Sequence, residues 1–189
     1  MLDHSCQVQR HPLADRGHDL YETPAVAVHA LLRVERLPHV IWEPACGPGA
    51  IVRVLRDAGH DVMATDLVRY KGMTGRLDFL KVQSAPPAVQ AIVTNPPFKI
   101  ANQFVAHAIE LCPLVVMLLR LAFLESEVRS SILDGGKLAR VHVFRRRLPM
   151  LHRAGWKGPK ASSAIPFAWM VWDRSHRGPA RLHRLSWDR

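Results

Sequence analysis

The sequence predicts an α/β protein with a doubly wound, mostly parallel sheet. Short apolar segments alternate with amphipathic segments at helical spacing, as in chains that alternate strand and helix. The strand segments are apolar throughout instead of at every second residue, which is typical of sheets covered on both faces. The chain has 189 residues, 48% of them apolar, which suffices for the core of a single domain.

The first elements follow from their residues. A helix is expected from Pro24, because proline suits the first turn, to a point before Pro38. Residues 39–45 form a short apolar run that stops at a Gly-Pro-Gly sequence, which predicts a buried strand followed by a turn. Residues 50–58 carry apolar side chains at helical spacing, and Gly59 suits the end of that helix.

The same alternation continues to the end of the chain. Strands are expected at residues 61–66, 91–94, 114–119, 141–144 and 167–172. Helices are expected at residues 100–111 and 125–133, and a glycine-containing loop at residues 72–80.

The positive charge of the chain is concentrated in its last part. The formal net charge is +10, and residues 137–189 hold 13 of the 26 basic side chains but only 2 of the 16 acidic ones. A basic segment of this kind indicates a polyanionic partner, with nucleic acid ahead of an acidic membrane surface. A solvated basic surface is the alternative.

Several classes of protein are disfavoured by composition. The first residues lack the apolar core of a secretory signal, and the apolar stretch at 111–124 is interrupted by Pro113 and Arg120. Three cysteines without a CxxC pair favour a reducing, cytoplasmic compartment over a disulfide framework. The histidines lack metal-ligand spacing, so no metal is expected.

A glycine turn follows the strand at residues 39–45 and suits a nucleoside. Gly47 and Gly49 allow a ligand to approach the backbone closely. Asp66 ends the next strand, and a carboxylate about 20 residues after such a turn can accept both ribose hydroxyls. Val52 replaces the third glycine of a dinucleotide motif, which disfavours pyrophosphate binding and a nicotinamide-dependent oxidoreductase.

The most specific motif is the sequence Asn95-Pro96-Pro97-Phe98 directly after a strand. Two prolines cannot donate backbone hydrogen bonds, so they end the strand and stiffen the turn. The Asn95 side-chain oxygen and the Pro96 carbonyl are two acceptors for one NH₂ group. When both hydrogens of the amine are held in this way, the nitrogen lone pair is free to attack an electrophile. The ring of Phe98 offers a face on which a planar group can stack.

Together these motifs resemble the class I S-adenosylmethionine (SAM) dependent methyltransferases. The closest likeness is to the NPPF/NPPY amino-methyltransferase group, which includes the N6-adenine DNA methyltransferases, and it covers residues 21–124. The resemblance implies a Rossmann-like sheet of seven strands with the last strand antiparallel. It also implies catalytic roles for Asn95, Pro96, Pro97 and Phe98 toward the amine.

The resemblance further implies SAM as cofactor and S-adenosyl-L-homocysteine as product. In such a site, Glu43, Cys46, Gly47 and Gly49 contact the methionine end, and Asp66 the ribose. Asp78 and Phe79 hold the adenine, while Tyr21 and Thr23 close over the methionine carboxylate. Two alternatives stay open: Asp78 as the cap of a turn, and Thr23 as the N-cap of the following helix.

The motif serves three kinds of NH₂ group in this superfamily: adenine N6, guanine N2 and the glutamine amide. Basic residues are expected at the same edge of the sheet as this motif. They favour nucleic acid, DNA ahead of RNA, because cations beside a tryptophan suit phosphates and an unstacked base. The residues expected to contact nucleic acid are Lys99, Arg145, Arg147, Arg153, Trp156, Lys157 and Lys160. The alternative of a different class is a non-catalytic module that binds nucleic acid or a partner enzyme.

The chain is expected to comprise an N-terminal arm (1–20), one methyltransferase domain (21–173) and a basic tail (174–189). This leaves no room for a separate target-recognition domain. Recognition is therefore expected to use short loops, a second copy of the chain in a homodimer, or a partner subunit.

Overall fold

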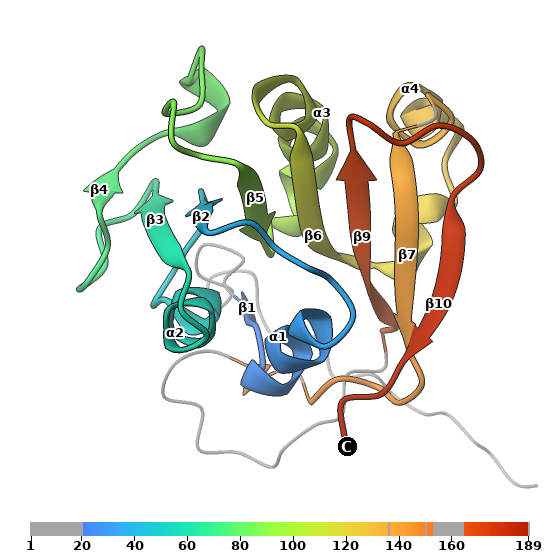
Figure 1. Ribbon diagram of the computed structural model, residues 1–189, viewed down its shortest axis with the longest axis horizontal. Helices are drawn as coiled ribbons and strands as arrows, with labels where there is room; N and C mark the ends of the chain where they lie inside the picture. Colours follow the sequence, from blue (N-terminus) through green and yellow to red (C-terminus); the bar gives the residue numbers. More distant parts are fainter. Residues whose placement is uncertain (1–20, 136, 150, 153–164, 189) are drawn as a thin grey trace, which may run out of the picture.

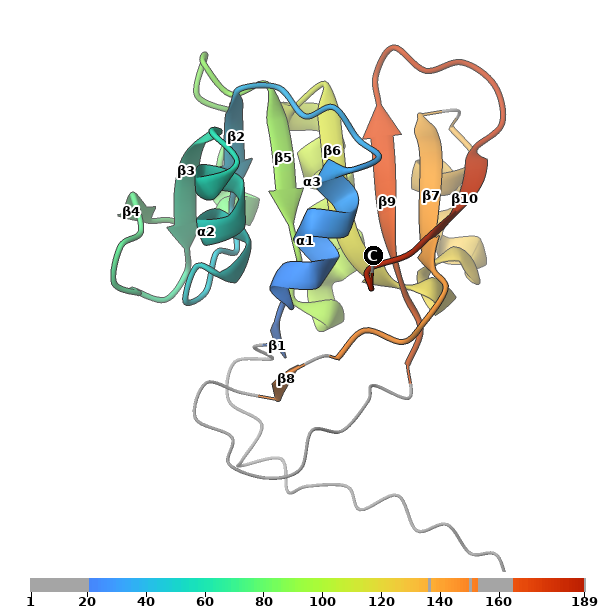
Figure 2. The same ribbon diagram turned by 60° about the horizontal axis from the view of Figure 1, so that its bottom comes forward.

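The computed structural model describes residues 21–135, 137–149, 151–152 and 165–188. Within these residues one sheet has eight strands in the order β10-β7-β9-β6-β5-β2-β3-β4 (Figures 1 and 2). Its strands are β2 (Val40–Glu43), β3 (Asp61–Asp66), β4 (Gly75–Arg76), β5 (Ala91–Thr94), β6 (Leu114–Arg120), β7 (Leu138–Phe144), β9 (Phe167–Asp173) and β10 (Arg181–Leu185). Strand β9 is antiparallel to its neighbours β6 and β7, and the other neighbouring strands are parallel. The doubly wound α/β class is therefore confirmed.

Helices cover both faces of this sheet. One face carries α1 (Ala25–Leu32) and α2 (Ala50–Asp57), and the other carries α3 (Ala101–Leu111) and α4 (Ser130–Leu133) (Figure 1). Neighbouring residues of one strand pack into different cores: Ile41 lies in the cluster under α1 and α2, and Trp42 in the cluster under α3. Strands that bury both faces need apolar side chains at successive positions, which explains the continuous apolar runs.

The helix expected at residues 125–133 forms over residues 127–133, and only its last four residues are α-helical. A 3-10 turn at Glu127–Arg129 precedes the four residues of α4. The Ser130 hydroxyl donates to the Glu127 carbonyl at 2.6 Å, and Val128 is 82% exposed. A serine that bonds the local backbone competes with helix formation, and an exposed valine adds no packing to oppose it.

The segment expected to be a basic tail contains the eighth strand. Strand β10 pairs with β7 in parallel, so that His183 lies beside His142 and Leu185 beside Phe144. Leu185 is buried, whereas the other four residues of β10 are exposed. A strand at the edge of a sheet with a single buried side chain carries almost no apolar pattern, which is why the sequence does not predict it.

A buried ionic cluster ties the segment after α1 to the sheet. Glu35 accepts hydrogen bonds from Arg140 Nε at 2.6 Å and contacts His142 Nε2 at 2.6 Å. The His142 ring stacks on His183, with the ring centroids 5.3 Å apart. Burial opposes ionisation of Glu35, but the hydrogen bonds from His142 and Arg140 outweigh it and lower the pKa of this carboxyl.

The strand order places a crevice between β2 and β5. Strands β3 and β4 lie on one side of β2, and strands β5 and β6 lie on the other side. In doubly wound sheets ligands bind beyond the carboxyl ends of the strands at such a reversal. We call the edge formed by the carboxyl ends of β2, β3, β5, β6 and β7 the rim. No helix among the described residues is long and apolar enough to cross a membrane.

Candidate active site at the rim

A cleft opens on the rim between the turn after β2 and the turn after β5. It encloses about 900 Å³, including space open to solvent. Thirteen residues were assigned to the catalytic motif and the cofactor, and the structure describes twelve of them fully. Eleven of these twelve line the cleft: Thr23, Glu43, Cys46, Gly47, Asp66, Asp78, Phe79, Asn95, Pro96, Pro97 and Phe98.

The glycine turn and the end of β3 form one wall of the cleft. The Gly47 N–H donates to Asp66 Oδ2, and the Val68 N–H to Asp66 Oδ1, both at 2.9 Å. Gly49 does not line the cleft but starts α2 in the left-handed conformation, with φ at 86°, which disfavours any residue with a Cβ. These contacts hold the carboxylate of Asp66 at the cleft, and each of its oxygens keeps capacity for a further hydrogen bond.

Glu43 belongs to the same wall of the cleft and is the last residue of β2. It is only 2% exposed, and its Oε2 has no hydrogen-bond partner among the described residues. Burial raises the pKa of this carboxyl well above its ordinary value, while the Val52 backbone hydrogen bond opposes the rise. A buried acceptor without a partner marks a place where a ligand donor or cation would be stabilised.

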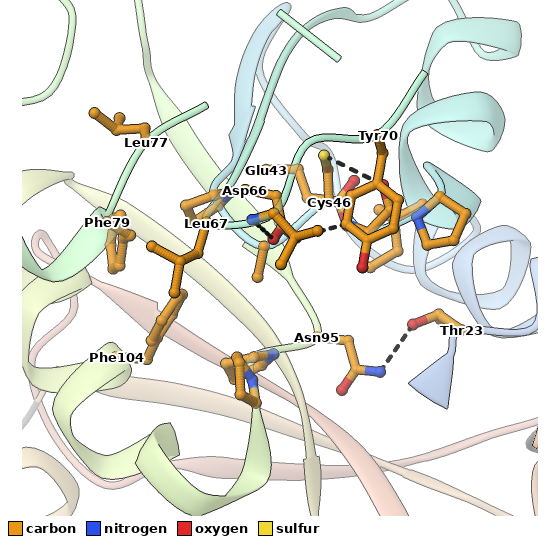
Figure 3. A pocket seen from close by; sticks show the side chains of 18 of the residues that line it. Thr23, Glu43, Cys46, Asp66, Leu67, Tyr70, Leu77, Phe79, Asn95 and Phe104 are labelled. Atoms are coloured by element: carbon orange, nitrogen blue, oxygen red, sulfur yellow. Dashed lines mark hydrogen bonds between the residues drawn. The ribbon is translucent and has the colours of Figure 1, made fainter. Parts of the chain in front are cut away.

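Cys46 and Tyr70 lie together beside Glu43 (Figure 3). Burial, followed by the charges of Glu43 and Asp66, raises the pKa of the Cys46 thiol to about 12. The thiol therefore stays protonated near neutral pH, which argues against a nucleophilic role. Burial and the nearby Asp66 charge also raise the pKa of Tyr70.

The opposite end of the cleft is apolar. Leu67, Leu77, Phe79 and Phe104 gather there, away from Glu43 and Cys46 (Figure 3). Phe79 is 3% exposed and packs edge-on against Trp42, with the ring centroids 5.2 Å apart. Leu67 is 57% exposed beside the cleft, so a flat apolar ligand group would cover it.

The cleft residues that the sequence did not predict include Leu67, Tyr70, Leu77 and Phe104. Leu67 directly follows Asp66, so its position after a strand end was the available signal. The other three residues reach the cleft only through the path of the loop after β3 and the packing of α3.

Asp78 borders the apolar end and occupies the N-cap position of the turn that follows it. It precedes the 3-10 turn at Phe79–Lys81, and its side chain makes no capping hydrogen bond. Its carboxylate lies 3.3 Å from Lys81 Nζ, in an exposed pair. Asp78 thus stands at the cap position, but its side chain does not cap the turn.

The Asn95-Pro96-Pro97-Phe98 turn forms the other wall. The Asn95 Nδ2 donates to the Thr23 hydroxyl at 3.1 Å (Figure 3). The guanidinium of Arg120, at the end of β6, lies 4.4 Å from the centre of the Phe98 ring. Phe167 contacts the same ring at a centroid distance of 5.7 Å. These contacts support Phe98 from outside the cleft that it lines.

The expected nucleic-acid residues are only partly described. Lys99 is exposed directly after Phe98, and Arg145 and Arg147 are exposed after the end of β7. The three consecutive arginines, Arg145 to Arg147, follow the end of β7. The backbone of Tyr21 lies in β1 (Tyr21–Glu22), which pairs with β8 (Leu151–His152). Arg153, Trp156, Lys157 and Lys160 lie outside the described residues.

No protein-family model matches the sequence, and none of the curated proteins compared with it does either. Solved structures do match the fold. A protein from Pyrococcus horikoshii described as an RNA methyltransferase superposes with a TM-score of 0.60 at 14% identity, covering 82% of this chain and 87% of that one. The 23S rRNA methyltransferase ErmE gives 0.54 at 16% identity, covering 81% and 68%.

A third match is a protein from Vibrio vulnificus described as the modification subunit of a type I restriction enzyme. Its TM-score is 0.58 at 13% identity, and the match covers 90% of this chain but 48% of that one. The chain thus spans about half the length of that subunit. At these identities the matches define the fold, which is the Rossmann-like fold of class I methyltransferases.

Proposed function

We propose that the chain is a SAM-dependent methyltransferase that modifies the N6 amine of adenine in nucleic acid, with DNA preferred over RNA. The observation that carries this proposal is the Asn95-Pro96-Pro97-Phe98 turn, which lines the cleft opposite the glycine turn and Asp66. In doubly wound sheets such a crevice is the ligand site. The pair of hydrogen-bond acceptors at the wall of this crevice can activate an amine, whereas a non-catalytic binding module would not need such a pair.

The two ends of the cleft suit the parts of SAM. The apolar end with Leu77 and Phe79 fits an adenine ring, and Asp78 can accept from its amino group. Asp66, held by two backbone N–H groups, has oxygen lone pairs left for ribose hydroxyls. The unpartnered Oε2 of Glu43 fits the methionine ammonium, whose charge would offset the cost of burying a carboxylate.

The same arrangement assigns roles toward the target amine. The bound cofactor supplies an electrophilic methyl group on a sulfonium. The Asn95 amide oxygen and the Pro96 carbonyl accept the two amine hydrogens, which withdraws the nitrogen lone pair from the ring. Phe98, supported by Arg120 and Phe167, stacks on the base. A base in duplex DNA must leave the stack to reach this wall.

Two further observations support nucleic acid as the substrate. Lys99, Arg145 and Arg147 are exposed and follow the carboxyl ends of β5 and β7, so they belong to the same rim as the cleft. Fold neighbours include proteins described as a restriction-enzyme modification subunit and RNA methyltransferases, and the first of these favours DNA.

The test is transfer of labelled methyl from SAM to separate pools of DNA, RNA and protein, followed by identification of the product. We expect N6-methyladenine in DNA. Asn95→Ala should lower turnover by about 10²–10³-fold, as loss of one transition-state hydrogen-bond group does elsewhere, while SAM binding by calorimetry persists. Asn102→Ala, at the start of α3, is the matched control.

Three results would contradict the proposal in different ways. A folded protein that does not bind SAM excludes the cofactor. Label in RNA guanine or in protein glutamine, with none in adenine, replaces the substrate. Asn95→Ala with the turnover of the wild-type chain excludes the assigned role of Asn95.

A further inference from the structure

The hydroxyl of Thr23 makes a direct hydrogen bond to Asn95 at the wall of the cleft. Its oxygen lies 3.1 Å from Asn95 Nδ2, and both residues line the cleft (Figure 3). Thr23 is 5% exposed. The contact joins residues 72 positions apart in the sequence, so only the folded chain creates it.

The Thr23 hydroxyl does not cap the helix that follows. Pro24 is the N-cap residue of α1, and no side chain makes a capping hydrogen bond there. The first turn is closed by the backbone, with the Ala27 N–H donating to the Pro24 carbonyl at 2.9 Å. The alternative that Thr23 is the N-cap of this helix is therefore wrong, and its hydroxyl serves Asn95 instead.

The position of this hydroxyl is well defined. A residue before proline is restricted to extended conformations, and a β-branched side chain has few rotamers. Helix α1 is anchored below it by the fully buried Ala27 and Leu31. The indole N–H of Trp169 in β9 also donates to the Ala27 carbonyl at 2.9 Å. Thr23 thus presents its oxygen to Asn95 from a rigid base.

An asparagine side chain has two chemically different ends. Its NH₂ donates and its carbonyl oxygen accepts, and rotation by 180° exchanges them. In the structure the NH₂ is turned to Thr23, which turns the oxygen away from Thr23. An amine target needs an acceptor, because an NH₂ facing another NH₂ places donors against donors.

We propose that Thr23 is a positioning residue that holds the Asn95 amide with its oxygen toward the target amine. This role rests on the function proposed above. It differs from a contact with the cofactor, because it acts on turnover once SAM is bound. Removal of the hydroxyl lets the amide rotate, so that only part of the molecules present the acceptor.

The test compares Thr23→Val, which keeps the shape but removes the hydroxyl, with Thr23→Ser, which keeps the hydroxyl. Thr23→Val should lower kcat about tenfold, as loss of one hydrogen bond does, with the dissociation constant of SAM changed by less than about threefold. Thr23→Ser should restore most of the turnover. Thr94→Val is the control, because the buried Thr94 hydroxyl has no partner among the described residues.

A second background isolates the orientation of the amide. In Asn95→Asp both side-chain oxygens are acceptors, so rotation exchanges equivalent ends. Adding Thr23→Val to Asn95→Asp should therefore cost much less turnover than adding it to the wild-type chain. Equal costs in the two backgrounds would overturn the positioning role.

The remaining outcomes separate this inference from the proposed function. A wild-type chain that methylates nothing overturns both. An active wild type in which Thr23→Val keeps its kcat, loses only SAM affinity, or is not rescued by Thr23→Ser overturns the positioning role alone.

Discussion

Glu43 shows how one residue combines motif, burial and charge. It ends β2, is 2% exposed, and lies where the glycine turn begins. Its place in the motif singles it out in the sequence. The unpartnered Oε2 and the raised pKa could not be read from the sequence, because both depend on what the fold packs around the carboxyl.

The raised pKa predicts a specific dependence of stability on pH. Above its ordinary value near 4.5, the Glu43 carboxyl is ionised in the unfolded chain but stays protonated in the folded one. The unfolded chain then binds fewer protons, so the free energy of unfolding falls as pH rises, until the raised pKa is passed. In that window Glu43 contributes a loss of about 1.4 kcal/mol per pH unit.

Glu43→Gln removes this contribution. Urea unfolding at pH 5 and pH 7 should show that the wild-type chain loses more stability over this interval than Glu43→Gln does. Glu125→Gln changes an exposed glutamate and should follow the wild type. Parallel pH profiles for the wild type and Glu43→Gln would exclude a raised pKa at this site.

Strand β10 forms through contacts with distant parts of the chain and not through its own sequence pattern. Four of its five side chains are exposed, so the polar pattern resembles that of a solvated end. The strand forms because its backbone completes the hydrogen bonds of β7 and because Leu185 enters the core under α1. The Arg33 side chain also donates to the Ser186 carbonyl at 2.7 Å, just after the end of β10.

The two leucines of β10 are therefore expected to differ in how much they contribute to stability. Leu185 is 4% exposed and Leu182 is 67% exposed. Leu185→Ala should lower the free energy of unfolding by about 2–4 kcal/mol, because it removes buried methyl groups and leaves a cavity. Leu182→Ala should change it by less than about 0.5 kcal/mol.

Urea denaturation of the two variants measures this difference. Equal and small effects would mean that β10 does not pack on the sheet in solution. Equal and large effects would mean that Leu182 is covered by something outside the described residues.

At the scale of the whole molecule, the parallel strands divide the charged residues between two edges. Arg145 and Arg147 follow the carboxyl end of β7 and belong to the rim, the edge of the sheet on which the cleft opens. Arg36 precedes the start of β2, and Arg177 follows the end of the antiparallel β9, so both belong to the opposite edge. The positive charge of the sequence thus has a spatial distribution that composition cannot express.

This distribution predicts which arginines contact phosphates. Replacing Arg145 and Arg147 together by Ala should weaken DNA binding and reduce the salt slope of log K by about 0.9 for each phosphate that the protein no longer neutralises. Fluorescence anisotropy across a range of salt concentrations measures the slope. The double variant of Arg36 and Arg177 changes the net charge equally and should keep the wild-type slope. An identical decrease of the salt slope in both double variants would mean that overall charge, and not the position of the arginines, controls DNA binding.

The amino-acid sequence alone predicts the alternation of strand and helix, the places of the two motifs at strand ends, and the segregation of charge. These are local properties, since apolar periodicity, glycine turns and consecutive prolines act through neighbouring residues. Three features depend on the folded chain: the hydrogen bond between Thr23 and Asn95, the positions of Leu77 and Phe104 at the cleft, and the place of β10 in the sheet. Each of these contacts links distant parts of the chain, and its free energy comes from burial and hydrogen bonds that exist only once the fold has closed.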